Sequence, residues 1–501
     1  MPFVWNFPLF TIVLCLFSGV LCMMLRGRTA RNYTIVLEAV LIVMVSAVLW
    51  YTYTAGSAFT YSMGEFPAPW GNEIRAGCLE ALIALTFLIV MLCSVIGGWR
   101  FIAIDIDESK INLYFSILNL MTAALMAMAW TNDIFTGYVF VEILTLTSCG
   151  VLIAREIGRT TLAAVRYMIL NLLGSGLFLL GVVLLYDLTG NLLMVPMHEA
   201  IEELWAAGQG IAPLTLAMGI ITIGLGIKSG LFPFHYWMPD TYGMATPTSG
   251  AVLSSLVSKS YIFLLIKIVW RVVGLDIWRE MPVARILFVL GICGMVAGSM
   301  SAIRVNNINS MVAFSSAAQI GYIYMGIGLG GPAGFTAAIF HILGHAVTKS
   351  LLFLTTPRLA EVSGDSLRFK DLQGSGYRAP ESGAFFMLAA LSMIGIPIFA
   401  GFSSKILFGI AAADEGGWRF FVIMLALALS TLLNVLYFLR TVIRIYTRRG
   451  SDLTKPAIDM PGGVKWDYVL PAAVLTLANL FLGLFSWAAV DIIEKGFGMF
   501  F

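Results

Sequence analysis

Apolar runs of about 20 residues recur along almost the whole chain, and each is long enough for one α-helix to cross a bilayer. The chain is 59% hydrophobic and only 12% charged, which excludes a soluble globular protein. We therefore predict an all-α integral membrane protein of about 14 transmembrane helices. The predicted spans are 7–25, 33–54, 79–99, 112–130, 133–153, 165–187, 212–232, 248–270, 284–303, 311–330, 334–355, 384–408, 420–442 and 467–490.

Basic residues divide the connections between these spans into two sets. Most arginines and lysines lie in the connections after odd-numbered spans. The connections after even-numbered spans and the ends of the chain hold few, namely Arg75, Arg271, Arg279, Arg285, Arg419 and Lys495. Positive charge gathers on the cytoplasmic side of membrane proteins. We therefore expect a multi-pass protein of the cell membrane with both termini on the outer side. The first span lacks a preceding basic segment, so we expect it to be retained rather than cleaved as a signal peptide.

Ionisable side chains lie inside five of the apolar runs, where a bilayer least tolerates charge. Such a group is costly at bilayer depth, so it normally faces a protein interior or a hydrated cavity. A single residue of this kind could be a structural accident, but a series over five spans indicates a path for protons or cations. Its members are Glu142, Lys228, Lys259, Lys267, His341, His345, Lys349 and Lys405.

Glycine and proline interrupt the seventh and twelfth spans beside two of these lysines. Gly230 and Pro233 follow Lys228, and Pro397 and Gly401 precede Lys405. Paired interruptions in the two halves of a membrane protein are typical of inverted repeats with discontinuous helices. The backbone groups that a break frees need water or polar partners, which hydrates the middle of the membrane. The alternative is a proline kink in a packed helix.

Glu142 and Lys228 could act together, because an acid and a base that share a buried site can exchange charge states. The alternative is a buried structural ion pair, which satisfies both charges without transport. Lys259 is predicted to bridge the two halves of the chain. Lys267 lies two turns later, and we expect it to reach outward from the end of its helix.

His341, His345 and Lys349 follow one another at intervals of four residues, so they lie along one stripe of a helix over about 12 Å. Histidine titrates near neutrality and can pass protons through either ring nitrogen. No carboxylate or cysteine accompanies them, so we reject a zinc site. His341 could equally be a packed histidine bonded to a carbonyl. His235, in the loop after Lys228, could admit protons or could be an ordinary solvated histidine.

The remaining polar and sulfur-containing residues indicate no cofactor. We expect Glu38 and Glu80 to contact neighbouring subunits or to mark helix ends, and Asp133 to mark the outer end of the fifth span. The six cysteines form no CxxC pair, so we expect no disulfide framework, iron–sulfur cluster or zinc site. No glycine-rich nucleotide loop is present, and the net charge of +2 gives no indication of nucleic-acid binding.

Several stretches around these residues carry recognisable motifs. FVEILTLTSC contains Glu142, and GIKSGLFPFHYWMPDTYGMATPTSGAVLSSLVSK runs from Lys228 to Lys259. They are followed by NNINSMVAFSSAAQIGYI, HILGHAVTKSLLFL and IGIPIFAGFSSKILF. In this order they resemble the antiporter-like subunits shared by Mrp-type multisubunit cation/proton antiporters, respiratory complex I and membrane-bound hydrogenases. YSMGEFPAPWG, before the third span, is similar to the D-type member of the Mrp antiporters.

The resemblance implies a fold with two inverted five-helix repeats and discontinuous helices 7 and 12. The expected parts are the N-terminal helices (1–110), the first repeat (111–272), the second repeat (283–445) and a C-terminal loop and helix (446–501). The resemblance also implies a proton relay, with weaker roles for His341 and His235. Its main members are Glu142, Lys228, Lys259, His345, Lys349 and Lys405.

The implied function is proton translocation by a D-like subunit of an Mrp-type Na⁺/proton antiporter. The implied partners are other membrane subunits, including a second antiporter-like subunit, and the ions are protons and Na⁺. One alternative is the related pumping subunit of a complex I-type oxidoreductase or a membrane-bound hydrogenase. An independent solute transporter should carry a substrate pocket and a long linker, and neither is evident. The series of buried lysines argues against a purely structural scaffold.

Overall fold

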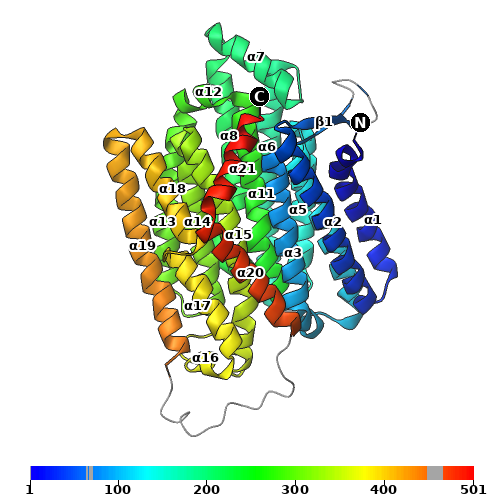
Figure 1. Cartoon of the computed structure of the whole chain (residues 1–501), viewed down its shortest axis with the longest axis vertical. Coiled ribbons are helices and arrows are strands. Elements are labelled where there is room, and N and C mark those ends of the chain that lie inside the picture. Colours follow the sequence, from blue (N-terminus) through cyan, green and yellow to red (C-terminus); the bar gives the residue numbers. More distant parts are fainter. Residues whose placement is uncertain (1, 64–65, 67–70, 448–465, 501) are drawn as a thin grey trace.

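The computed structural model describes residues 2–63, 66, 71–447 and 466–500 of the chain. It is a bundle of long helices that run roughly parallel to one another (Figure 1). Among the described residues, 13 helices or helix runs are long and apolar enough to cross a membrane. The predicted all-helical membrane fold is therefore confirmed. Part of the YSMGEFPAPWG stretch and most of the predicted C-terminal loop lie outside the described residues.

The first half of the chain forms eight long helices and several short ones. They are α1 (Phe7–Met24), α2 (Gly27–Ala55), α3 (Cys78–Asp105), α4 (Ile111–Trp130), α5 (Ile134–Ile153), α6 (Gly158–Thr189), α7 (Met194–Ala206), α8 (Ile211–Ser229), η4 (Phe234–Trp237) and α9 (Met238–Tyr242). The eighth span is one continuous run of α10 (Pro247–Val252), η5 (Leu253–Val257), α11 (Ser258–Ile268) and η6 (Val269–Val273). A short antiparallel hairpin joins β1 (Phe59–Ser62) to β2 (Glu73–Ala76), with Phe59 opposite Ala76.

The second half follows the same plan. Its helices are α12 (Leu275–Glu280), α13 (Pro282–Arg304), α14 (Ile308–Leu329), α15 (Pro332–Glu361), α16 (Ser375–Arg378), α17 (Pro380–Ile394), α18 (Ala400–Glu415), α19 (Gly417–Ile445), α20 (Trp466–Leu484) and α21 (Ser486–Gly498). Helices α17 and α18 are each short and follow one another where the twelfth span is predicted. Figure 1 shows α17 below α18 in the bundle.

Both predicted interruptions are real breaks, and the backbone forms the same hydrogen bonds at each. Helix α8 ends at Gly230, whose φ is +83°, and the N–H groups of Gly230 and Leu231 both donate to the Gly226 carbonyl. Helix α17 ends at Gly395, whose φ is +92°, and the N–H groups of Gly395 and Ile396 both donate to the Leu391 carbonyl. Glycine is favoured at both positions because other residues rarely adopt a positive φ.

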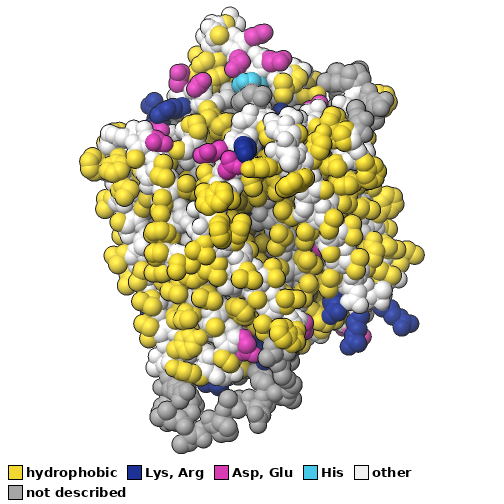
Figure 2. Space-filling view, viewed as in Figure 1, with side chains coloured by type: hydrophobic (Ala, Val, Ile, Leu, Met, Phe, Trp, Pro, Cys, Tyr) yellow, Lys and Arg dark blue, Asp and Glu magenta, His cyan; other side chains and the backbone are white. Residues whose placement is uncertain are grey.

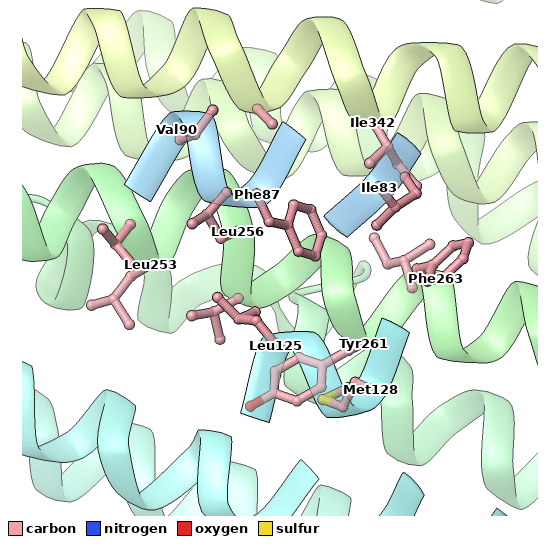
Figure 3. Close-up of a cluster of buried hydrophobic side chains, with 14 of the residues drawn as sticks. Ile83, Phe87, Val90, Leu125, Met128, Leu253, Leu256, Tyr261, Phe263 and Ile342 are labelled. Atoms are coloured by element: carbon pink, nitrogen blue, oxygen red, sulfur yellow. The ribbon is translucent and has the colours of Figure 1, made fainter. Parts of the chain in front are cut away.

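The centre of the bundle consists of helices that are buried on all sides. The most apolar windows of the eighth span and of α15 are completely buried, whereas α2, α6, α13 and α19 expose much of their apolar surface. Figure 3 shows how side chains of α3, α4, η5, α11 and α15 pack together in this centre. Large apolar side chains are exposed around the outside, as expected where a helix meets lipid or another membrane subunit.

Figure 1 shows both ends of the described chain on one face, together with α7 and α12, and α16 on the opposite face. We name these the terminal face and the basic face, because the connections at the second hold most arginines and lysines. Hydrophobic side chains cover the band between them, and charged side chains gather at its two ends (Figure 2). Two ends on one face fit an even number of crossings. Which face is cytoplasmic stays a prediction.

For the N-terminal helices, the prediction for Glu38 needs correction and the helix-end alternative for Glu80 is confirmed. Glu38 does not contact a neighbouring subunit through an exposed surface, because its side chain is 0% exposed and accepts a hydrogen bond from Thr122 of α4. Glu80 does lie at a helix end, in the first turn of α3, but it is also fully buried and forms an ion pair with Arg75. Asp133 caps the start of α5 as predicted, since it accepts from the Thr136 N–H at 2.6 Å.

Candidate functional site

The ionisable residues predicted from the sequence lie on five central elements of the bundle. Glu142 is on α5, Lys228 on the last turn of α8 and Lys259 on α11. His341, His345 and Lys349 are on α15, and Lys405 is on α18. Lys228, Lys259 and Lys349 are all 0% exposed, so these amines face the protein interior. We refer to the set below as the buried row.

Glu142 and Lys228 face one another at one end of the buried row. The Glu142 Oε1 and Lys228 Nζ atoms are 3.9 Å apart, which is close enough for attraction but too far for a hydrogen bond. Lys228 donates instead to the Thr145 hydroxyl at 2.7 Å, and its Nζ lies 5.5 Å from the centre of the Tyr261 ring. Glu142 Oε1 has no hydrogen-bond partner among the described residues. The pair is therefore loose, with room to exchange a proton through a small movement or a water molecule.

Lys259 occupies the middle of the buried row, just after the π-helical segment η5. Its Nζ donates to the Ser254 carbonyl and to the Ser258 hydroxyl at 3.1 Å. A π-helical turn disturbs the regular backbone ladder, and such turns are frequent at functional sites. Lys259 is also close enough to His345 and Lys349 to interact electrostatically with both. Lys259, which lies in the first half of the chain, is therefore near the stripe on α15.

The stripe on α15 continues the row toward α18. Lys349 donates to the Val312 carbonyl at 2.7 Å and to the Ser315 hydroxyl. The His341 and His345 rings lie 5.7 Å apart between their centres. His341 Nδ1 is 2.7 Å from the Ser404 hydroxyl, so its partner is a side chain rather than a carbonyl.

Lys405 lies at the break between α17 and α18. Its Nζ donates to the Ile394 carbonyl at 2.5 Å and to the Thr431 hydroxyl at 2.8 Å. The Ile394 carbonyl ends α17, so the lysine satisfies a backbone group that the break leaves free. Lys405 and Lys228 therefore both sit beside a helix break, but only Lys405 bonds to the broken backbone.

A small cavity of about 20 Å³ separates the histidines from Lys405. That volume accommodates about one water molecule. Its lining includes Gln319, His341, His345, Ser404 and Lys405. A water molecule here could therefore join the stripe on α15 to the lysine on α18.

Unsatisfied polar atoms mark further places where water is needed. Within the described residues, both ring nitrogens of His345, the Gln319 side-chain nitrogen and the Ser255 hydroxyl are buried without a hydrogen-bond partner. Buried polar groups are nearly always paired with protein or with ordered water. We therefore expect water molecules along the buried row, which is what proton transfer between separated groups requires.

The structure overturns the expectation for Lys267. Its side chain does not reach outward but is 0% exposed, and its Nζ donates to the carbonyls of Ala129 and Thr131 at 2.8 and 2.5 Å. These carbonyls lie at the C-terminal end of α4, where backbone acceptors lack partners within the helix. Lys267 therefore stabilises a helix end inside the bundle.

The structure also excludes a solvated loop position for His235. The residue is only 1% exposed, and its ring packs against Tyr236 and Phe232, with centres 4.3 and 5.8 Å away. Within the described residues neither ring nitrogen has a partner. Asp240, which lies near it in the sequence, pairs instead with Arg166 at 3.2 Å. A buried histidine with two free nitrogens beyond the end of α8 still fits a role in proton access.

Sequence reasoning missed the hydroxyl and amide groups that hold the row in place. Thr145, Ser258 and Ser404 lie within one helical turn of a predicted site residue, so their spacing offered a signal. Gln319 of α14 lies within the NNINSMVAFSSAAQIGYI motif, although the motif does not single out its side chain, and nothing in the sequence links Thr431 of α19 to the site. Among the described residues, no three His, Cys, Asp or Glu side chains are placed to hold a metal ion.

The protein has relatives along its full length. The family model described as NADH:quinone oxidoreductase/Mrp antiporter, TM, matches residues 131–432. NADH-quinone oxidoreductase subunit N of Desulforudis audaxviator is 30% identical over 497 residues, covering 96% of each chain. The D subunit of the Na(+)/H(+) antiporter from Bacillus subtilis is 26% identical over 484 residues, covering 96% of this chain and 94% of that one.

Solved structures share the fold. A chain of the Mrp complex from Dietzia sp. DQ12-45-1b matches with a TM-score of 0.87 at 23% identity, covering 99% of this chain and 97% of that one. A chain of the membrane-bound sulfane sulfur reductase, an archaeal respiratory membrane complex, matches with a TM-score of 0.86 at 22% identity, covering 99% and 96%. The resemblance predicted from the motifs is confirmed.

Proposed function

Because the chain belongs to the family of membrane proteins described as NADH:quinone oxidoreductase/Mrp antiporter, TM, we propose that it carries protons across a cell membrane as one subunit of a larger complex. The observation that supports this function best is the buried row itself. Seven ionisable side chains on five elements lie within an apolar bundle, five of them buried, next to a cavity and to unsatisfied polar atoms. A merely structural bundle has no need of them, because buried charges are costly in a membrane.

In the proposed mechanism, protons enter one half of the protein near His235 and reach Lys228. They then pass through Lys259 to His345 and Lys349, and through the cavity to Lys405. Lysine suits such a relay because its ammonium group readily gives up a proton when it is buried. His341, which is bonded to Ser404 beside the cavity, has a secondary role. The negative charge on Glu142 attracts a proton onto Lys228, because Coulomb interactions are strong inside a protein. Neutralisation of Glu142 removes this attraction, so Lys228 then gives up its proton to the next group.

We also propose that residues 111–272 and 283–445 form two inverted five-helix repeats. The matching hydrogen bonds at Gly230 and Gly395 support this assignment, because equivalent breaks then lie in equivalent helices. Each break places a lysine close to the middle of the membrane. Two similar half-paths joined through Lys259 and α15 would follow from such symmetry. The predicted orientation, with the terminal face outside, belongs to the same proposal.

For the driving force, we propose exchange of protons for Na⁺ in an Mrp-type assembly, with other membrane subunits as partners and a second antiporter-like subunit among them. The relative from Bacillus subtilis, a Na(+)/H(+) antiporter protein, supports this assignment. The relative from Desulforudis audaxviator supports the second candidate, proton pumping driven by the redox chemistry of partner subunits. Purifying the intact complex separates the two. Redox subunits in the complex would favour pumping, and their absence together with Na⁺-dependent proton movement would favour exchange.

Replacing Glu142 tests whether its charge is needed. We expect Glu142→Gln to remove most proton transport, because glutamine keeps the volume but cannot ionise. The substitution also leaves Lys228 without its counter-charge. Glu142→Asp should retain part of the activity, because a carboxylate remains one methylene farther from Lys228. Transport is measured as collapse of a pH gradient in vesicles that contain the whole complex. Glu203→Gln, an exposed position on α7, is the matched control. Equal behaviour of the two Glu142 variants would mean that the residue only packs.

A second test asks whether His345 and Lys349 of α15 lie on the same proton path. We expect His345→Ala and Lys349→Ala each to slow transport, and the double variant to be no slower than the more damaging single one. Groups on one path are non-additive, because the loss of any link stops the same flow. The same vesicle assay applies, normalised to the amount of assembled complex. Losses of free energy that simply add would instead indicate two independent structural effects.

A further inference from the structure

A second set of buried polar side chains lies outside the buried row, where α1, α2 and α4 pack together. Glu38 of α2 is completely buried. Its Oε1 atom accepts a hydrogen bond of 2.9 Å from the Thr122 hydroxyl of α4. Its Oε2 atom is also buried and has no partner among the described residues. Half of this carboxyl group is therefore left without a donor or a counter-charge.

Asn119 provides a second unpartnered oxygen close by. Its side-chain nitrogen donates to the Cys22 sulfur of α1 at 3.2 Å, and that sulfur lies 3.9 Å from the Thr34 hydroxyl of α2. Its Oδ1 atom is buried without a partner in the described part of the chain. Thr34 and Glu38 lie one turn apart on α2, and Asn119 and Thr122 lie about one turn apart on α4. Glu38 and Asn119 therefore share one group of polar side chains, contributed by α1, α2 and α4.

No basic side chain balances the Glu38 carboxylate in the described structure. The elements packed against α2 are α1, α3, α4 and the short helices η1 (Phe3–Asn6) and η3 (Glu108–Lys110), and the one lysine of η3, Lys110, pairs with Glu156. The titratable group that interacts with Glu38 from these helices is the Cys15 thiol of α1, and the interacting hydroxyl is that of Thr122. Glu38 also lies 11 residues beyond Gly27, which places it about 16 Å along α2 from the basic face. A bare carboxylate at that depth is costly, so it needs a proton or a bound cation.

We propose that Glu38 and Asn119 form a binding site for a small monovalent cation, Na⁺, which competes there with a proton. Two free oxygens and neighbouring hydroxyls are ligands that hard cations prefer, and a single carboxylate balances a single positive charge. Binding follows one balanced exchange, in which Na⁺ replaces the carboxyl proton and the proton is released. The site lies between α1, α2 and α4 and contains no member of the buried row, so cation exchange and the proton relay occupy different parts of the bundle.

The first test measures the site without transport. A hydrophobic carbodiimide modifies a buried carboxyl group only in its protonated form, and mass spectrometry of the purified complex identifies the modified residue. We expect Glu38 to be modified, and Na⁺, but not choline at the same concentration, to slow the modification. Glu38→Gln should lose the label, and any label on Glu142 should not respond to Na⁺. If Na⁺ does not slow the labelling of Glu38, the carboxyl group binds a proton but not Na⁺. If Glu38 is not labelled at all, its carboxyl group is not protonated. Either result overturns the proposal.

The second test uses transport and rests on the proposed Na⁺/proton exchange. We expect Glu38→Gln to raise the apparent KM for Na⁺ about tenfold or more, since it removes a charged ligand. Asn119→Ala should raise it less, and Glu38→Asp should restore part of the affinity. A relay variant that keeps part of its activity, Glu142→Asp, should lower the rate without raising the KM. An unchanged KM in Glu38→Gln would overturn the site. If the wild-type complex exchanges no Na⁺, the antiport proposal fails. The labelling test still shows whether Na⁺ binds at Glu38.

Discussion

Lys228→Ala is expected to reduce proton transport to the level of vesicles that lack the protein, while expression and assembly remain close to wild type. Lys228 is completely buried, and its Nζ lies between the Thr145 hydroxyl and Glu142. Alanine removes the group that would carry the proton but suits a helix well. Glu142 loses its counter-charge, yet its side chain is 27% exposed and can take up a proton. The fold therefore has a way to tolerate the change, whereas the relay has none.

The measurement is recovery of fluorescence from a pH-sensitive dye as the gradient collapses, with the amount of complex determined in the same vesicles. Lys110→Ala is the matched control, because Lys110 is exposed and pairs with the exposed Glu156. The control should transport as well as the wild type. Wild-type transport by Lys228→Ala would remove this lysine from the path and with it the first half of the proposed relay.

The helices of this protein and the two breaks could be predicted because their causes are local. A run of about 20 apolar residues is enough to specify a crossing helix, and a glycine that must adopt a positive φ is enough to end one. The breaks at Gly230 and Gly395 accordingly lie where the sequence places them. The helix stripe of His341, His345 and Lys349 follows from spacing alone, and the structure keeps it on α15.

The errors all concern partners that are distant in the sequence. Lys267 looks free to extend toward the membrane surface until the end of α4 supplies two carbonyls, at Ala129 and Thr131. Glu38 looks exposed until α4 brings Thr122 to it, 84 positions away. His235 lies in a loop that folds back into the bundle, where the distant Phe314 of α14 packs edge-on against its ring. No spacing rule predicts such contacts, because they depend on how whole helices pack.

The same reasoning applies to the candidate site. Lysines and histidines at bilayer depth are evident from the sequence, because each interrupts an apolar run. The cavity beside Lys405 is not, since α14, α15, α17 and α18 each contribute part of its lining. The hydrogen bonds that position the lysines, such as that from Lys405 to Thr431, depend on the same packing. The sequence therefore identifies the groups that could carry a proton, and the structure is needed to show how they connect.

Lys405→Arg is expected to stop proton transport although it preserves the positive charge. In the structure Lys405 Nζ donates to the Ile394 carbonyl and the Thr431 hydroxyl, and an arginine can donate to both. Any purely electrostatic or capping role at the break should therefore survive the substitution. An arginine does not release its proton at accessible pH, because its pKa lies above about 12, so a relay through this position must stop. Ile406→Val, an exposed conservative change on the same helix, should have little effect.

Crowding by the larger side chain can be separated from loss of proton exchange. Thr431→Ala in the Lys405→Arg background removes one neighbour and makes room for the guanidinium group. We expect this double variant to remain inactive, whereas recovery would identify crowding as the cause. The protein should assemble normally in every case, since the charge and one hydrogen-bond partner are kept.

Proton flux through vesicles that contain the complex with Lys405→Arg is therefore the most direct test of a relay along the buried row. The proposed mechanism predicts assembled complex with no flux above that of empty vesicles, in the presence and in the absence of Thr431. Flux equal to that of the wild type would contradict it. Lys405 would then act only as a fixed positive charge at the break, and protons would cross the membrane by another route.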